Sequence, residues 1–246
     1  MNQTEFHKHS ATFSNGNSFE KIRRLLDFLG DEPLDILDVG CGASPTLHKT
    51  LRTLGHRITG LDIFPASPTS QHSKILESDI NETWPVPKDS FDLVLCTDVP
   101  EHLYDPTHIL REGKRVLRKD GSIIFGVPNH FDLRQRLRML SGGGIIHWDH
   151  VRYGESGWNY AHIRFFTLQE LLHGFREHEW FVRAAQFNFM GGGIFPTRFT
   201  PRFFRRFLLT RFPNLFSGKF LFLLQKEPLR SQKITWISLD KTPKGV

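Results

Sequence analysis

The chain has 246 residues, of which 39% are hydrophobic and 24% are charged, and its formal net charge is +6 at pH 7. These values are ordinary for one globular α/β domain, and no segment has the roughly 18 uninterrupted apolar residues that a membrane-spanning helix needs. The N-terminus, MNQTEFHKHSATFSNGN, has no apolar core before a small-residue cleavage site, so we expect a cytoplasmic location. The two cysteines, Cys41 and Cys96, form no disulfide or zinc pattern and are expected to be reduced.

Strand-like and helix-like segments alternate along the chain. The expected strands are short apolar, branched runs, and the expected helices open on capping residues or prolines. In chain order we predict a helix over 17–30, a strand over 34–40, a helix over 44–55, strands over 56–64, 73–80 and 91–96, a helix over 105–117, a turn at Asp120-Gly121, a strand over 122–128, a helix over 167–178 with a capping box, and strands over 180–189 and 219–225. This alternation predicts a parallel, doubly wound α/β sheet.

Glycines and acids gather at the predicted strand ends. Gly40 and Gly42 form a turn between the first strand and the next helix, where a ligand can approach the backbone closely. Asp38 precedes this turn, Asp62 ends the second strand and Asp79 follows the third. Because the carboxyl ends of such strands neighbour one another, we expect a cofactor of the adenosine type at this edge.

The segments LDVGCGASP, GLDIF, ESDI and FDLVLCTDVPEHL resemble the successive motifs of class I S-adenosylmethionine-dependent methyltransferases, especially the type-11 small-molecule group. The match covers residues 34–127, with a looser similarity at HIRFFTLQELL and in the closing strand pair. The resemblance implies a mostly parallel, seven-stranded, Rossmann-like sheet with an antiparallel last strand. Ser44 replaces the frequent third glycine of the turn, but Ser44 also suits a helix N-cap, so we expect cofactor binding to be intact.

The resemblance also implies roles for the glycine turn and the first two acids. Gly40, Cys41 and Gly42 would pass under the methionine part of S-adenosylmethionine, and Asp38 would orient its amino group directly or through water. Asp62 would accept hydrogen bonds from both ribose hydroxyls, because the two oxygens of a carboxylate can accept simultaneously.

The adenine end of the cofactor is assigned in the same way. Asp79 would hold the adenine amino group, while Ile63 and Ile80 would pack against the ring. Thr97 would line the floor of the cofactor site. Nicotinamide binding is the nearest competing interpretation, but its fingerprint needs a third glycine where this chain has Pro45.

Methyl transfer from a sulfonium needs alignment and exclusion of water more than it needs a base. If a base is used, His102 is the first candidate, although His102 could equally contact the cofactor or backbone without moving a proton. Glu101 could be a surface helix residue. We predict no metal site, because His147, Asp149 and His150 are adjacent loop residues without a further ligand.

We expect one domain over 1–228, with an insertion on the acceptor side over 129–164 and a polar tail over 229–246. Long segments at this edge are often lids or binding loops. The candidates to shape the acceptor pocket are His147, Trp148, Asp149, His150, Tyr153, Trp158 and His162.

Basic residues concentrate near the C-terminus, where residues 195–233 hold nine Lys or Arg against one acid. Within this stretch, 195–217 form a connector between the last two strands that interleaves Phe with Arg. Phe203, Phe207, Leu208 and Phe212 could share one helical face that touches an anionic membrane through 198–222. The alternative is a helix with its phenylalanines in the core, and nucleic-acid binding is disfavoured because no recognised module accompanies the basic residues.

The sequence thus predicts an S-adenosylmethionine-dependent methyltransferase acting on a small-molecule or lipid-like acceptor. The alternative from another class is a noncatalytic domain that keeps the cofactor fold and binds a partner or a membrane surface. The methylated atom and the oligomeric state stay open.

Overall fold

The computed structural model describes residues 18–42, 46–63, 74–145, 162–190, 200–227 and 235–239. Its elements are α2 (Ser18–Leu26), β1 (Asp35–Val39), α3 (Thr46–Thr53), β2 (Arg57–Asp62), β3 (Lys74–Glu77), β4 (Phe91–Thr97), the 3₁₀ helix η1 (Pro100–His102), α4 (Thr107–Val116), β5 (Leu117–Pro128), α5 (Leu133–Leu140), α7 (Leu168–Glu177), β6 (Phe181–Phe189), α8 (Arg202–Arg211), α9 (Pro213–Phe216), β7 (Ser217–Gln225) and β8 (Thr235–Leu239).

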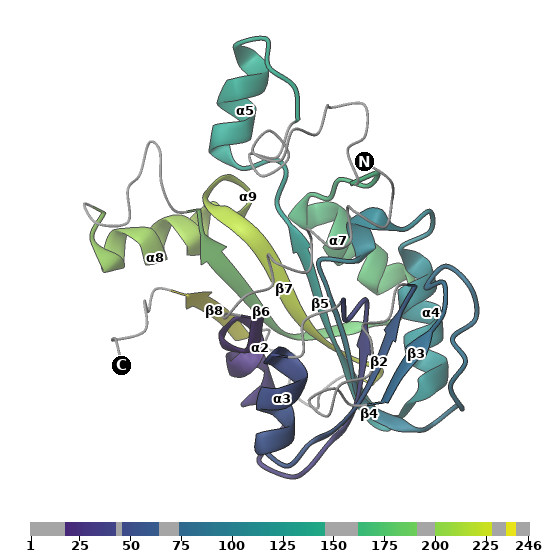
Figure 1. Ribbon diagram of the computed structural model, residues 1–246. Coiled ribbons are helices and arrows are strands. Elements are labelled where there is room, and N and C mark those ends of the chain that lie inside the picture. The colour runs from purple at the N-terminus through teal and green to yellow at the C-terminus, as the bar shows by residue number, and fades with distance from the viewer. Residues whose placement is uncertain are drawn as a thin grey trace.

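One sheet organises these elements, with the strand order β3-β2-β1-β4-β5-β7-β6-β8 (Figure 1). Strands β1 to β5 pair in parallel, and β7 runs antiparallel to both of its neighbours, β5 and β6. The predicted doubly wound, mostly parallel sheet with an antiparallel last strand is therefore confirmed. The strand order changes direction between β1 and β4, since β2 and β3 follow β1 on one side and β5 follows β4 on the other. In such sheets, ligands bind in the crevice at the carboxyl ends of the two strands at this switch point.

The sheet has an eighth strand that the sequence did not predict. Strand β8 pairs in parallel with β6, with Thr235 opposite Ala184 and Leu239 opposite Asn188. It lies within 229–246, for which the sequence predicts a polar tail. The expectation was wrong for these residues because a short edge strand can form from backbone hydrogen bonds without a long apolar run.

Two apolar layers cover the two faces of the sheet. One core cluster joins α2 and α3 to β1, β4 and β7, with Leu25, Ile36 and Leu51 fully buried. The other joins α4 and α7 to the opposite face, where Ile109 and Phe175 are buried. Figure 1 shows the helix pairs on opposite sides of the strands, and this three-layer arrangement holds the carboxyl ends of β1, β2 and β4 in fixed positions.

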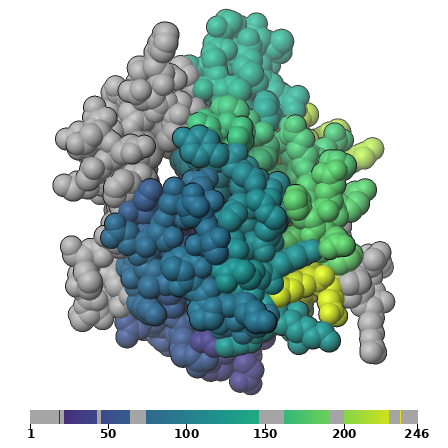
Figure 2. Space-filling model, turned by 90° about the vertical axis from the view of Figure 1, so that its right-hand side faces the viewer, coloured from purple at the N-terminus to yellow at the C-terminus, as the bar shows by residue number. Residues whose placement is uncertain are grey.

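Helices α4 and α7 belong to one continuous surface. Figure 2 shows their teal and green atoms side by side, and Lys114 Nζ donates to Glu179 Oε2 at 2.9 Å across this boundary. Trp180, just after α7, is buried, and its indole N–H donates to the carbonyl oxygen of Leu110 at 3.2 Å. A buried indole needs such a partner, so this contact fixes α7 against α4.

Local signals in the sequence set two of the boundaries. Thr167 caps α7 through the predicted capping box, in which its side chain and Glu170 bond reciprocally to the two backbone N–H groups. Strand β5 begins at Leu117, earlier than the strand predicted over 122–128. Its pairing with β4 jumps from Leu117 to Ser122, so the predicted turn at Asp120-Gly121 lies in an irregularity of this ladder.

Helix α8 lies in the predicted connector between β6 and β7, and its buried side chains are not the phenylalanines. Leu208 and Leu209 are buried, whereas Phe203 is 76% exposed and Phe207 is 56% exposed. The predicted shared face is therefore wrong for Leu208, which is buried while Phe203 and Phe207 are exposed. The alternative, with the phenylalanines in the core, is wrong for Phe203 and Phe207. Within the described ranges, no helix is both long enough and apolar enough to cross a bilayer.

Candidate functional site

The glycine turn after β1 has the backbone that its sequence requires. Gly40 and Gly42 have φ angles of +72° and +62°. Residues with a side chain rarely adopt this left-handed backbone conformation, whereas glycine adopts it readily. Gly40 donates its N–H to the carbonyl oxygen of Leu61 at 2.7 Å, and a Cβ built at Gly40 would lie 2.3 Å from Val99 Cγ2. A Cβ at Gly42 would meet no atom within 4 Å, so Gly42 leaves its backbone open to a ligand.

Two carboxylates flank this turn. Asp62 Oδ2 accepts the Gly42 N–H at 2.8 Å, and Asp38 Oδ2 lies 2.9 Å from Nε2 of His48 on α3. Both aspartates are only 7% exposed. Burial raises the pKa of the Cys41 thiol, and the charges of Asp38 and Asp62 raise it further. The turn therefore has a negative field that suits a positively charged ligand and keeps Cys41 protonated.

The end of β3 lies beside the end of β2, because Ser78 donates its N–H to the carbonyl oxygen of Asp62 at 3.0 Å. Asp79 is exposed, and its Oδ1 accepts the backbone and side-chain N–H groups of Asn81, both at 2.9 Å. Ile80 is buried, whereas Ile63 is 41% exposed. The structure thus brings Asp79 to the same edge as Asp62, with its carboxylate partly engaged in a turn.

The chain bends sharply after β4. Asp98 has a φ angle of +60°, its N–H donates to the carbonyl oxygen of Gly126 at 3.0 Å, and its carboxylate pairs with Lys219 at the start of β7. Unusual backbone of this kind is concentrated at functional sites. A small pocket opens here, and it is lined by Ile22, Leu47, Leu95, Thr97, Asp98, Lys219 and Leu221. The predicted floor residue Thr97 therefore lines a pocket at the carboxyl end of β4.

Helix η1 follows this bend and holds the predicted base. Its residue His102 is half-buried, and its ring meets the His162 ring edge to face, with centroids 4.7 Å apart. Glu101 is only 1% exposed, so the interpretation of Glu101 as a surface residue is wrong. Val99 and Pro100, which precede Glu101, are buried as well.

Sequence reasoning missed several groups that the structure brings to this edge. These are His48 and Lys219, the partners of the acids Asp38 and Asp98. His162 was predicted only as a residue of the acceptor pocket, and its contacts with Glu101 and His102 were not foreseen. Only the adjacent pair Glu101 and His102, which follows the predicted strand over 91–96, is a sequence signal for part of the cluster with His162. Other predicted residues lie outside the described ranges, namely Ser44, Pro45, His147, Trp148, Asp149, His150, Tyr153 and Trp158.

A glycine turn at the switch point of this sheet, flanked by buried acids at the ends of β1 and β2, is the arrangement expected of a class I S-adenosylmethionine-dependent methyltransferase. The family model described as "Methyltransferase domain" matches residues 14–185, which is more than half of the chain. The chain therefore belongs to the methyltransferase domain family, and S-adenosylmethionine is its cofactor.

Curated relatives match part of the chain. A ubiquinone biosynthesis O-methyltransferase from Xanthomonas oryzae pv. oryzae is 31% identical over 103 residues, which are 38% of this chain and 43% of that protein. A malonyl-[acyl-carrier protein] O-methyltransferase from Paenibacillus sp. is 34% identical over 111 residues, which are 39% of this chain and 40% of that protein. The chain thus spans about two fifths of the length of these relatives.

Solved structures share the fold over nearly the whole chain. A SAM-dependent methyltransferase from Archaeoglobus fulgidus has a TM-score of 0.58 at 16% identity and covers 90% of this chain and 99% of its own. The 1,6-didemethyltoxoflavin-N1-methyltransferase of Burkholderia thailandensis, solved with bound 1,6-didemethyltoxoflavin and S-adenosylhomocysteine, has a TM-score of 0.57 at 16% identity and covers 91% of this chain and 84% of its own. At this identity the likeness establishes the fold.

Proposed function

We propose that the protein transfers the methyl group of S-adenosylmethionine to an oxygen atom of a small-molecule or lipid-like acceptor. The observation that carries the proposal is the open backbone at Gly42 between the buried carboxylates of Asp38 and Asp62. An oxygen acceptor is supported by the names of two relatives, a ubiquinone biosynthesis O-methyltransferase and a malonyl-[acyl-carrier protein] O-methyltransferase.

The reaction is an in-line displacement at an activated carbon. The bond between the sulfonium sulfur and the methyl carbon breaks, the bond between the acceptor oxygen and that carbon forms, and S-adenosylhomocysteine leaves with the sulfur electron pair. The acceptor proton passes to a base or to water. The protein accelerates this step by aligning the two reactants and excluding water, and His102 on η1 is the candidate base.

The cofactor assignments follow the strand ends. We assign the methionine part to the turn Gly40, Cys41 and Gly42, with Asp38 held by His48 toward the amino group. The ribose belongs to Asp62. Asp79, Ile63 and Ile80 then receive the adenine at the end of β3. A positively charged sulfonium is favoured at the turn because the two buried carboxylates are close by.

Calorimetric titration with S-adenosylmethionine and S-adenosylhomocysteine tests these assignments. Asp62→Ala should weaken both ligands at least about tenfold, because a hydrogen bond to a charged group contributes about 1.5–3 kcal/mol. Asp62→Asn should bind with intermediate affinity, since its amide oxygen can still accept the Gly42 N–H. The control Asp120→Ala changes an exposed aspartate at the start of β5 and should bind like the wild type. Unchanged affinity in Asp62→Ala would contradict the ribose assignment.

The acceptor is found by incubating the protein with labelled S-adenosylmethionine and a metabolite extract. We expect label to enter a small or lipid-like product as a base-stable ether or a base-labile ester. Label on nitrogen or carbon would overturn the oxygen assignment. Tight binding of S-adenosylhomocysteine without any labelled product would favour a noncatalytic cofactor-fold domain.

We also propose that α8 docks on an anionic membrane surface and so gives access to a lipid-like acceptor. Phe203, Phe204 and Phe207 are 76%, 38% and 56% exposed, and the last two rings stack with centroids 6.5 Å apart. The same helix carries Arg202, Arg205, Arg206 and Arg211 and no acid. Exposed aromatic rings among arginines suit the boundary between headgroups and acyl chains, where burial of rings and attraction to anionic lipid add together.

Sedimentation with lipid vesicles tests this surface. The wild type should pellet with anionic vesicles at low salt and much less with neutral vesicles or at high salt, because salt screens exposed charges. Phe203→Ser with Phe207→Ser should reduce pelleting, while Leu54→Ser, a 52% exposed residue after α3, should leave it unchanged. Equal pelleting of all variants, or none by the wild type, would remove the proposal.

A further inference from the structure

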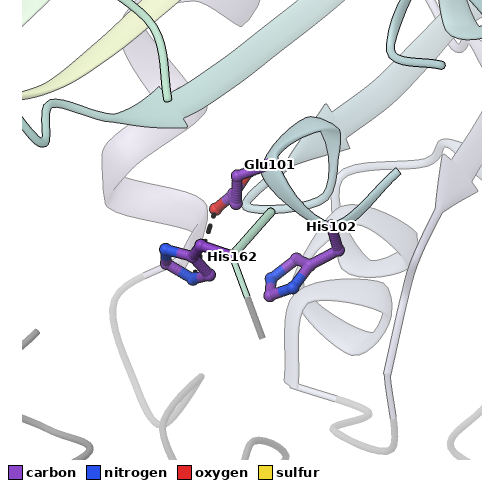
Figure 3. A group of neighbouring side chains, drawn as sticks. All are labelled: Glu101, His102 and His162. Atoms are coloured by element: carbon purple, nitrogen blue, oxygen red, sulfur yellow. Dashed lines mark ion pairs between the residues drawn. The ribbon is translucent and has the colours of Figure 1, made fainter. Parts of the chain in front are cut away.

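Three side chains meet beyond the end of β4. Glu101 and His102 come from η1, and His162 comes from the segment that leads into α7. Figure 3 shows the carboxylate of Glu101 and the two rings turned toward one another. His162 Nε2 lies 4.0 Å from Glu101 Oε1, and one ligand atom from each of the three residues lies within 4.8 Å of the others. Two imidazoles and a carboxylate form a ligand set that divalent transition metals accept.

In the described part of the chain, one oxygen of the buried Glu101 carboxylate is unsatisfied. Its side chain is only 1% exposed, and Oε2 has no hydrogen-bond partner among the described residues. A buried carboxylate oxygen without a hydrogen-bond partner is costly, and a bound cation would compensate for that cost.

The backbone holds the two halves of the cluster together. The carbonyl oxygen of Glu101 accepts the N–H groups of Ile163 and Arg164 at 2.9 and 3.1 Å. His162 Nδ1 lies 2.7 Å from Nε2 of the buried residue His130. In the tautomer in which His162 Nδ1–H donates to His130, Nε2 carries a lone pair toward Glu101. Histidines that bind metals are usually oriented by such a bond from the other ring nitrogen.

We propose that Glu101, His102 and His162 form a binding site for one divalent transition metal ion, such as Zn²⁺, Co²⁺ or Mn²⁺. Metal–ligand bonds of about 2.0–2.2 Å require the ligand atoms to move closer together than they are here, which rotations of the three side chains can supply. Mixed imidazole and carboxylate ligands favour these ions over Mg²⁺ or Ca²⁺, which prefer oxygen ligands. This inference departs from the prediction of no metal, which considered other residues.

The position of the site gives the ion a role that rests on the proposed function. Val99, two residues before Glu101, packs on the glycine turn at Gly40, so the segment that carries Glu101 and His102 starts at the cofactor turn. Three protein ligands leave at least one coordination position open, as in catalytic metal sites. The ion would bind an acceptor oxygen there, orient it toward the methyl group and promote loss of its proton to solvent. His102 would then act as a ligand of the ion and not as the base.

Titration of the metal-stripped, full-length chain with Co²⁺ and Zn²⁺ tests the site. Bound Co²⁺ is followed by its visible absorption, and Zn²⁺ is measured by competition. The wild type should bind one ion per chain. Mutation of a residue that only hydrogen-bonds to a metal ligand weakens metal affinity by about 10–100-fold. Glu101→Gln and His162→Gln change the ligands themselves, so each should weaken metal affinity by at least that factor. His173→Gln, an exposed histidine on α7, is the matched control and should bind like the wild type.

The outcomes separate the metal site from the proposed function. S-adenosylhomocysteine should bind Glu101→Gln and the wild type equally, and thermal unfolding should show that each variant is folded. Wild-type protein without bound ion, or wild-type metal affinity in both site variants, would overturn the metal site while cofactor binding stands. Metal binding without any binding of S-adenosylhomocysteine would instead overturn the proposed function.

Discussion

At the scale of single residues, Gly40 and Gly42 share a left-handed backbone but have different surroundings. Gly42→Ala should lower the free energy of unfolding by about 1–2 kcal/mol, the cost of a side chain in this conformation. Gly40→Ala should cost about 1–3 kcal/mol more, because its Cβ would overlap Val99 Cγ2. Denaturant unfolding of both variants measures the difference.

The double variant Gly40→Ala with Val99→Ala separates strain from overlap. Removing the Val99 methyl groups should recover part of the loss in Gly40→Ala and nothing in Gly42→Ala. Cofactor affinity should fall in Gly42→Ala despite its smaller effect on stability, because its methyl group would occupy the space open to a ligand. Absence of recovery would show that the contact with Val99 does not set the cost.

At the scale of elements, Glu112 ties α4 to the segment that follows β3. Glu112 Oε2 accepts the N–H of buried Trp84 at 2.9 Å and pairs with Arg115, which donates to the carbonyl oxygens of Trp84 and Val86. Burial favours a raised pKa for Glu112, but the hydrogen bonds from Arg115 and Trp84 outweigh it and lower the pKa below its ordinary value. The ionised form therefore stabilises the folded state.

Glu112→Gln should lower the free energy of unfolding at neutral pH by about 1–2 kcal/mol, less than a fully buried pair costs, because the Arg115 side chain is 32% exposed. A lowered pKa contributes stability above the unfolded-state value and loses it as the pH falls through the folded-state value. The difference between wild type and variant should therefore be largest at neutral pH and shrink below about pH 4.5. Unfolding curves at several pH values check this, and a constant difference would contradict it.

The elements also show how far sequence reasoning reaches. The capping box at Thr167 and the branched run before Gly40 are local signals, and both led to elements that the structure confirms. Strand β8 was missed because its pairing with β6 depends on a neighbour distant in sequence. The cofactor acids could be placed together because strand order follows from the fold class. His162 could not be paired with Glu101, because no periodic pattern connects their two segments.

At the scale of the whole molecule, β8 completes one edge of the sheet, far from the cofactor turn. A variant that ends after Glu227 would leave β6 paired with β7 but would remove the strand partner on its other edge from Ala184 to Asn188. Its free energy of unfolding should fall by roughly 2–5 kcal/mol, because each of a few backbone hydrogen bonds contributes about 1 kcal/mol. Sedimentation velocity should also show more self-association, since an exposed strand edge can pair with another chain. Cofactor affinity should stay unchanged, and a loss of affinity would contradict this separation.

The place of β7 has a consequence for biosynthesis. Strand β7 lies between β5 and β6, so β5, which pairs with β4 on one edge, has a partner on its other edge only after residue 225 has left the ribosome. A nascent chain that already contains β1 to β5 has an open edge at β5 while about a hundred further residues are translated, which takes roughly 5–20 s at ordinary elongation rates. During that interval the cofactor half is exposed to aggregation and to capture by chaperones.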